Sequence, residues 1–331
     1  MKRTWNIDSS QLKEVGETGT ESSSCVSTDH SSTTKIHKRE PNPPNLSNRL
    51  YFTKISGHPH RFNTNALSLR ELLEAISPVA SIHFNFMVDF PWLFAQYPRR
   101  CSMSPMTIIV GESNGTSQAE IRADAKKCAF ENLSVGRARL PIPFGTHHTK
   151  LSIFESDSER IHVIISTANL LQNDWESKTQ AFYHCKANIR NTEENEEEKI
   201  VDFGSDLVEY LNVYSSSRDF GMIEYWRDRI ANADFSGVGA RIISSIPGYH
   251  TGQAKEKYGH LRLRNVLASM KLKLHKPSFI AQFSSIGSLG AKPDSWLTGQ
   301  FLKSLAGGQT AGAFASSESF QSCYLLLFVG S

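Results

Sequence analysis

The sequence predicts an α/β domain in which a mixed sheet is flanked by helices. Segments with β-strand character alternate with segments of helical period between residues 50 and 305. The first four of these segments follow the order helix, strand, strand, helix, which is typical of a layered α/β fold. Hydrophobic residues make up 39% of the 331 residues and aromatic residues 10%, so the chain can bury a sizeable core.

Local signals place the first elements. Ser68 and Glu71 have the spacing of a capping box ahead of a run of apolar residues, so a helix begins there. Large apolar side chains alternate with mostly smaller or polar ones over Ile82–Phe90, which predicts a strand of period two. A β-rich run at Thr107–Val110 predicts a second strand. Apolar residues on one helical face between Ile121 and Ala129 predict the next helix.

The later elements follow from the same patterns. Residues 193–209 hold eight acidic residues and one lysine, and their early part is expected to form a solvated loop. The other expected elements are strands at Thr149–Phe154, Ile161–Ser166, Arg241–Ile246 and Ser278–Ser284, and helices beginning near Ile200, at Leu261–Met270 and at Trp296–Leu305.

Composition predicts the domain boundaries. Residues 1–48 are rich in Ser, Thr, Asn, Pro and charge and have almost no large apolar residues, so we expect them to be disordered. Residues 49–250 are expected to form a first domain, and residues 251–305 a connection and the start of a second. Residues 306–331 form a divergent tail that begins Gly/Ala/Ser-rich, with disorder expected over residues 306–320.

Composition also excludes several classes of protein. The five cysteines are odd in number and form no CxxC pair, which argues against a disulfide scaffold and structural zinc and favours a reducing compartment. The first residues are polar and charged, so no secretory signal is expected. The apolar run Tyr324–Val329 is too short to span a bilayer, so no membrane partner is expected. The net charge of +3 does not by itself indicate a nucleic-acid partner.

His148, Lys150 and Asn169 are the candidate catalytic residues. His148 and Lys150 are two residues apart, so on a strand both side chains lie on the same face. The ammonium of Lys150 can neutralise phosphoryl oxygens, and a neutral imidazole can attack phosphorus or transfer a proton. Asn169 ends the next apolar strand, and its amide can donate to a phosphate oxygen. The three residues predict a phosphoryl site that needs no metal.

A bare His-x-Lys pair is weak evidence. In a chain with twelve histidines it is expected about once by chance. His184 and Lys186 form a second instance without a suitable downstream Asn, and we interpret that pair as surface.

A longer string of motifs is more specific. It consists of Gly145-Thr-His-His-Thr-Lys150, Thr167-Ala-Asn169-Leu, Asp174-Trp175 and Lys178-Thr-Gln180, in this order. The string resembles the first catalytic motif of the tyrosyl-DNA phosphodiesterases, DNA-repair enzymes of the phospholipase D superfamily. Further similarity lies in Asp89–Pro98, Gly259–Arg264 and Phe279–Gly290, so the resemblance covers about residues 48–305.

The resemblance implies a phospholipase D-like fold and a role in repairing DNA strand breaks in the nucleus. The implied reaction hydrolyses the 3′-phosphotyrosyl bond between a DNA end and topoisomerase I, without a cofactor or metal. The implied partners are single- and double-stranded DNA 3′ ends and the topoisomerase-derived peptide. His148 would be the nucleophile that forms a phosphohistidine, and Lys150 and Asn169 would hold the phosphate.

The resemblance also implies binding residues outside this motif. Ser285 and Ser288 would contact the DNA backbone. Phe144 would stack on a base of single-stranded DNA, although from sequence alone a core aromatic beside a turn is nearly as probable. Gln180 would support the catalytic residues without contacting the substrate itself. Residues 255–276 carry seven Lys or Arg and one Glu, which suits either a DNA-backbone patch or ordinary helix-surface charge.

The family carries a second His-x-Lys and Asn in its C-terminal half, and the second histidine is the general acid. No His-x-Lys follows residue 186, and the sequence departs from the family near residue 306. We therefore expect a truncated isoform or an incorrectly predicted gene end, with impaired turnover. Two alternatives stay open: a non-catalytic DNA-binding fragment that keeps Lys150, Ser285 and Ser288, and a homodimer of one-motif copies.

Overall fold

The computed structural model describes residues 44–111, 118–127, 130, 132–138, 140, 146–190, 202–215, 222–246, 248–270 and 296–308. All of them belong to one compact unit, Pro43–Ser331. Phe144, Ser285, Ser288 and the strand predicted at Ser278–Ser284 lie outside the described residues, as does most of each segment expected to be disordered.

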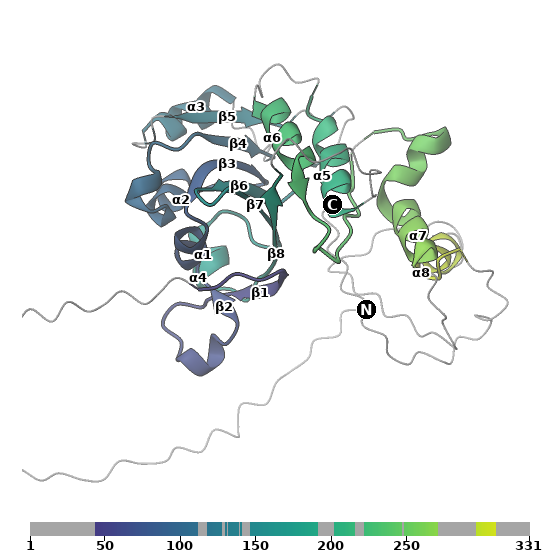
Figure 1. Cartoon of the computed structure of the whole chain (residues 1–331), viewed down its shortest axis with the longest axis horizontal. Coiled ribbons are helices and arrows are strands. Elements are labelled where there is room, and N and C mark those ends of the chain that lie inside the picture. The colour runs from purple at the N-terminus through teal and green to yellow at the C-terminus, as the bar shows by residue number, and fades with distance from the viewer. Residues whose placement is uncertain are drawn as a thin grey trace, which may run out of the picture. The chain divides into compact units, whose positions relative to one another are not determined.

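A mixed sheet of nine strands organises the described residues (Figure 1). The strand order is β2-β1-β8-β7-β6-β3-β4-β5, and β9 pairs with β8. Strands β3, β4 and β5 run parallel, whereas β3, β6, β7 and β8 are joined by antiparallel pairs. The strands are β1 Arg49–Thr53, β2 Ala66–Leu67, β3 Pro78–Asn85, β4 Met106–Val110, β5 Leu133–Arg137, β6 Leu151–Ser156, β7 Arg160–Ser166, β8 Ala181–Ile189 and β9 Ala233–Asp234.

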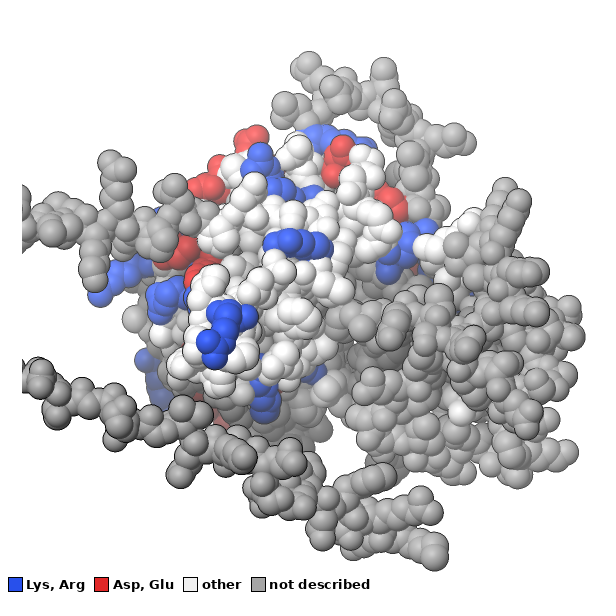
Figure 2. Space-filling model, turned by 90° about the horizontal axis from the view of Figure 1, so that it is seen from below, with Lys and Arg blue, Asp and Glu red and all other residues white. Residues whose placement is uncertain are grey.

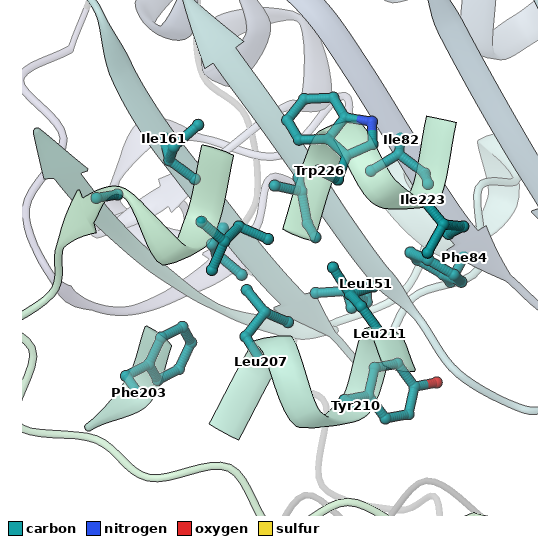
Figure 3. Packing of buried hydrophobic residues seen from close by; sticks show 14 of the residues in the cluster. Ile82, Phe84, Leu151, Ile161, Phe203, Leu207, Tyr210, Leu211, Ile223 and Trp226 are labelled. Carbon is teal, nitrogen blue, oxygen red and sulfur yellow. The ribbon is translucent and has the colours of Figure 1, made fainter. Parts of the chain in front are cut away.

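Helices cover both faces of the sheet. One core lies between the sheet and α1, α2, α3 and α4, and the other between the sheet and α5 and α6. Figure 3 shows the second core, where Leu207 and Leu211 of α5 and Trp226 of α6 pack with strand residues. The helices are α1 Leu69–Ile76, α2 Phe90–Gln96, α3 Gln118–Lys126, α4 Gln172–Glu176, α5 Phe203–Asn212, α6 Met222–Ala231, α7 Gly259–Ser269 and α8 Leu302–Leu305. The structure thus confirms the predicted mixed sheet flanked by helices.

Helix α1 begins as its capping box predicts. The Ser68 hydroxyl accepts the Glu71 backbone N–H at 3.2 Å, and the Glu71 carboxylate accepts the Ser68 N–H at 2.9 Å. Each bond satisfies a donor that the helix itself leaves without a partner. The predictions of β4, β7, α3, α5 and α7 are confirmed to within a few residues, and residues 297–305 are helical, as a π-helical turn followed by α8.

Strand β3 differs from its prediction at both ends. It begins at Pro78 and stops at Asn85, because Asp89 caps α2 by accepting the Trp92 N–H at 3.1 Å. Its alternate polar side chains are buried rather than exposed, since helices cover both faces. The ring nitrogens of His83 bond the hydroxyls of Ser152 (2.8 Å) and Tyr97 (2.7 Å), which offsets the cost of burying the imidazole.

The prediction that His184 and Lys186 lie on the surface is wrong for the histidine. Both belong to the inner strand β8, and His184 is fully buried. Its Nδ1–H donates to the Ser47 carbonyl at 3.0 Å, so its Nε2 accepts from His162 Nδ1–H at 3.0 Å. Burial lowers the pKa of His184 to about 4 and that of His162 to about 3. These hydrogen bonds stabilise His184 in the interior, although its polarity favoured a surface position.

The expected limits of disorder are too wide at both ends. Leu46 is buried, and Ser47 and Asn48 are hydrogen-bonded to strand β8. Ala306 is also buried, and its N–H bonds the Leu302 carbonyl at 2.9 Å. A few residues on each side therefore belong to the folded unit.

The strand predicted at Arg241–Ile246 is absent from the sheet. The segment is held instead by Asp206 in the first turn of α5, which accepts from Arg241 Nε at 2.7 Å and from the Ile242 N–H at 3.1 Å. Arg262 of α7 also pairs with Asp206. The Ile242 N–H therefore donates to the Asp206 carboxylate instead of to the carbonyl of a neighbouring strand.

Charged side chains are spread over the face that Figure 2 shows. On the face in Figure 2, Lys and Arg side chains lie mostly singly among uncharged residues. Within the described residues, no helix combines the length and apolar character needed to cross a membrane.

Candidate active site

His148 and Lys150 lie immediately before a strand, not on one as predicted. Strand β6 begins at Leu151, although the Lys150 carbonyl still accepts the Ser166 N–H of β7 at 3.0 Å. The two side chains nevertheless meet as expected, since Lys150 Nζ lies 3.0 Å from Nδ1 and 3.3 Å from Nε2 of His148. The site therefore stands at the end of the central strands β6 and β7.

The contact between these side chains fixes their charges. An ammonium only donates, so the ring nitrogen that faces Lys150 accepts with its lone pair, and His148 is neutral in this contact. Burial, assisted by the charge of Lys150, lowers the pKa of His148. Lys150 is only 8% exposed, and burial lowers its pKa to about 8, while the charge of Asp174 acts in the opposite direction. A neutral nucleophile beside a cation suits attack on a phosphate.

Asn169 follows β7 and is held by Asp174. One carboxylate oxygen of Asp174 accepts both the backbone N–H and the Nδ2 of Asn169 at 2.9 Å. The other accepts from Lys178 at 2.6 Å. Burial alone would raise the pKa of Asp174, but these hydrogen bonds outweigh it and lower the pKa.

Asn169 makes no hydrogen bond to His148 or Lys150 among the described residues. Its Oδ1 is buried without a partner there, and one of its amide hydrogens is taken by Asp174. The second amide hydrogen is left for a phosphate oxygen. Asn169 is thus linked to the His148–Lys150 pair through Asp174, whose charge acts on Lys150.

Gln180 lies behind the segment that carries Asn169. Its side-chain oxygen accepts from the Thr167 hydroxyl, and its backbone N–H donates to the Thr53 hydroxyl at 3.0 Å. Thr53 also donates its own N–H to the Gln180 carbonyl at 2.9 Å. Gln180 therefore joins β1 to Thr167, two residues before Asn169.

A pocket of about 260 Å³ opens beside His148 and Lys150. Apolar side chains from α5, β6, β7 and residues 242–243 line it together with hydroxyl-bearing residues. The lining residues are His148, Thr149, Lys150, Leu151, Ile165, Ser166, Thr167, Leu207, Tyr210, Ile242, Ile243, Ser244 and Ser245. A phosphate at His148 would thus have both hydroxyl donors and an apolar surface next to it.

Sequence reasoning missed four residues of this site. The Phe86 ring lies 4.8 Å from the His148 ring, centroid to centroid, just after β3 ends. Asp174 was noted in the motif but given no role. Tyr210 and Tyr214, which contact the residues beside His148, lie four apart on one helical face, and that spacing was the available signal.

The basic segment 255–276 is described only as far as Met270. Three of its basic residues are in ion pairs: Lys257 with Glu209 at 2.8 Å, Arg264 with Glu256 at 3.0 Å, and Arg262 with Asp206. These contacts favour ordinary helix-surface charge for the described part. Among the described residues, no cluster of three or more His, Cys, Asp or Glu is arranged to bind a metal ion.

Comparisons with known proteins agree with this geometry. The family model of tyrosyl-DNA phosphodiesterase matches residues 49–322. A probable tyrosyl-DNA phosphodiesterase of Caenorhabditis elegans is 40% identical over 268 residues, which cover 78% of this chain and 56% of that protein. Tyrosyl-DNA phosphodiesterase 1 of Arabidopsis thaliana is 33% identical over 278 residues, covering 81% and 44%.

The crystal structure of yeast tyrosyl-DNA phosphodiesterase has the same fold. Its TM-score is 0.50 at 19% identity, over 67% of this chain and 49% of that chain. The chain therefore spans about half the length of the relatives it matches. With a family model that extends over most of its length, the chain belongs to the tyrosyl-DNA phosphodiesterase family.

Proposed function

We propose that the chain carries the nucleophilic half-site of a phosphodiesterase that acts on 3′-phosphotyrosyl ends of DNA. One observation carries the proposal: a neutral His148 imidazole lies 3.0 Å from the Lys150 ammonium at the edge of a pocket. The names of the relatives supply the substrate class. The finer setting, removal of topoisomerase I from DNA in the nucleus, is part of the same proposal.

In the first step, the ring nitrogen of His148 that accepts from Lys150 is released from this contact, and its lone pair attacks phosphorus and forms a P–N bond. The P–O bond to tyrosine breaks, and its electron pair leaves with the phenolate oxygen. Lys150 neutralises the phosphoryl oxygens, and the second amide hydrogen of Asn169 donates to one of them. In the second step, water attacks phosphorus, the P–N bond breaks, and DNA with a 3′-phosphate is released.

The two steps place different demands on the site. The phenol of tyrosine has a pKa of about 10, so the phenolate leaves more easily than a sugar alkoxide, whose pKa is closer to the ~15.7 of water. The second step needs a base for water, and His148 is the only histidine among the described residues that line the pocket. Lack of a positioned base costs about 10²–10⁴-fold in rate. We therefore propose that the phosphohistidine accumulates.

The test is to incubate the full chain with a 3′-phosphotyrosyl oligonucleotide and to separate the products on a denaturing gel. An acid-labile adduct is expected, and His148→Ala should abolish it. His58→Ala is the matched control, since His58 lies in an exposed loop. Release of free 3′-phosphate DNA over many turnovers by a monomer would contradict accumulation.

The same experiment separates the alternatives. Binding of the oligonucleotide, measured by fluorescence anisotropy, without any adduct would identify a non-catalytic DNA-binding fragment. Turnover that depends on a dimer, measured by light scattering after gel filtration, would identify a site completed by a second copy.

A further inference from the structure

Four side chains form a hydrogen-bonded chain around His148. The Thr149 hydroxyl lies 2.6 Å from the Tyr210 hydroxyl, which lies 2.8 Å from the Tyr214 hydroxyl. The Tyr214 hydroxyl lies 2.6 Å from Nε2 of His147. The two ends of the chain are therefore the residues immediately before and after His148.

The two tyrosines form a rigid base for this chain. Tyr210 lies on α5 and Tyr214 one turn further on, where its N–H still bonds the Leu211 carbonyl at 3.0 Å. Both are buried, and their rings contact Phe84 of β3 at centroid distances of 6.2 and 4.7 Å. Figure 3 shows the Tyr210 ring in this core with its hydroxyl at the edge of the cluster. Burial raises the pKa of both hydroxyls, so both stay protonated.

Gly111 confines the same segment at His147. A Cβ at Gly111 would overlap the His147 carbonyl oxygen and lie 2.8 Å from His147 Nδ1. Gly111 is itself fixed to β3 by its N–H, which donates to the Asn85 carbonyl at 2.8 Å. The peptide that carries His148 is thus tied to α5 on both sides and packed tightly against the end of β4.

The hydroxyl groups are not needed for packing. Phenylalanine at either position would fill the same space in the core, whereas a buried hydroxyl without a partner is destabilising. Among the described residues, these hydroxyls bond only each other and the two neighbours of His148. Among those residues the His148 ring bonds only Lys150, so neither tyrosine hydroxyl competes with a phosphate for the ring.

We propose that Tyr210 and Tyr214 are positioning residues that hold the backbone of residues 147–149 and so aim His148 at the phosphorus atom. This inference rests on the proposed function, and it adds a specific cause for the reactivity of His148. A displacement of about 1 Å can lower the rate of a reaction by about 10²-fold, so loss of either hydroxyl acts on the chemical step rather than on substrate binding.

The kinetic test uses Tyr210→Phe and Tyr214→Phe in the full chain. Each should lower the maximal rate of adduct formation by roughly 10- to 100-fold, while the oligonucleotide concentration at half-maximal rate stays the same. Tyr225→Phe is the matched control, because it removes a hydroxyl bonded to Glu155 at the far end of β6 and should leave the rate unchanged. Thr149→Val combined with Tyr210→Phe should lower the rate of adduct formation no more than either change alone, because both changes remove the same hydrogen bond.

A second measurement does not depend on activity. In ¹⁵N-labelled histidine spectra, Tyr214→Phe should shift the Nε2 signal of His147, and both tyrosine variants should alter the titration of His148. If the wild type forms no adduct, the proposed function fails while these spectra still decide the positioning role. Unchanged His148 signals, or rates equal to those of Tyr225→Phe, would overturn the inference.

Discussion

Single residues set the ionisation that the site needs. His148 has to be neutral and Lys150 charged at the same pH; burial favours the neutral form of both residues, and the charge of Asp174 opposes this effect at Lys150. Burial disfavours the protonated form of each residue. The pH range in which the pair is competent therefore extends from below the ordinary histidine range to about the pKa of Lys150.

We expect a bell-shaped pH profile for the second-order rate constant of adduct formation. The rate should rise as His148 loses its proton, at a pH below the usual 6.5, and should fall as Lys150 loses its proton near pH 8. Lys150→Arg keeps its charge at all these pH values, so its residual activity should show no alkaline decline. An alkaline decline that stays in Lys150→Arg would assign it to another group.

Asp174 offers a second change to the same profile. Its charge raises the pKa of Lys150, so Asp174→Asn should move the alkaline limb to lower pH. The pH of the alkaline decline is the informative quantity, because the substitution also changes the hydrogen bonds to Asn169 and so lowers the rate at every pH. A limb that does not move would mean that Asp174 acts only through Asn169.

Gly111→Ala should destabilise the fold and abolish adduct formation. The added Cβ overlaps the His147 carbonyl, and overpacking of this kind costs about 1–3 kcal/mol. Gly237→Ala is the control, since no atom lies within 4 Å of its Cβ, and its effect should stay within about 0.5 kcal/mol. Guanidinium unfolding of both variants measures the difference. Equal stability of the two would show that the segment moves aside.

Elements are joined at the site by a few buried charges, of which Asp206 is the clearest. It ties α5 to residues 241–242 and to Arg262 of α7, and its side chain is 7% exposed. These contacts place Ile242 and Ile243 on the pocket wall. The position of this part of the pocket wall therefore depends on the ion pairs of Asp206 rather than on hydrogen bonds within the sheet.

Asp206→Asn should loosen residues 241–246 and α7 together. The change leaves the guanidinium groups of both Arg241 and Arg262 without a carboxylate, and breaking a buried pair costs about 3–5 kcal/mol. Glu209→Gln breaks the exposed pair with Lys257 and should cost less than about 1 kcal/mol. Hydrogen exchange resolved by peptide should show faster exchange in both segments for Asp206→Asn only. Fast exchange in only residues 241–246 or only α7 would show that Asp206 does not stabilise the two segments together.

The sequence predicts elements well where local signals decide, and less well where distant partners do. The capping box of Ser68 and Glu71 is local, and α1 begins there. His184 looks like a surface residue because its partners, Ser47 and His162, lie far away in the chain. In the site, the motif identifies His148 and Lys150, whereas the tyrosine contacts span 61 and 67 residues, and the spacing of the two tyrosines does not identify their partners.

At the scale of the whole molecule, four of the described histidines are buried and neutral. Burial lowers the pKa of His83 and His162 to about 3 and that of His147 and His184 to about 4. In the unfolded chain these residues titrate near the ordinary value of about 6.5. Below that pH, the unfolded state binds protons that the folded state does not, so stability falls as pH falls.

Unfolding by urea should therefore show full stability above about pH 6.5 and a steady loss toward pH 4. Each of these histidines removes up to about 1.4 kcal/mol per pH unit in that window. His83→Gln can keep bonds to Ser152 and Tyr97 and should reduce the slope by about one proton. Stability that is flat between pH 7 and pH 5 would show that the histidines find partners for their charged forms.

The pairing of β1 with β8 affects how the protein is made. The Thr53 hydroxyl bonds the Lys178 carbonyl, 125 residues further along the chain. At ribosomal rates of about 5–20 residues per second, β1 waits about 6–25 seconds for this partner to be synthesised. Until then, its other described neighbour is the two-residue strand β2, and Leu50 and Phe52 are exposed even in the finished fold. The nascent chain thus presents an unpaired strand with apolar side chains for many seconds, and we expect its yield in a cell to depend on chaperone capacity during translation.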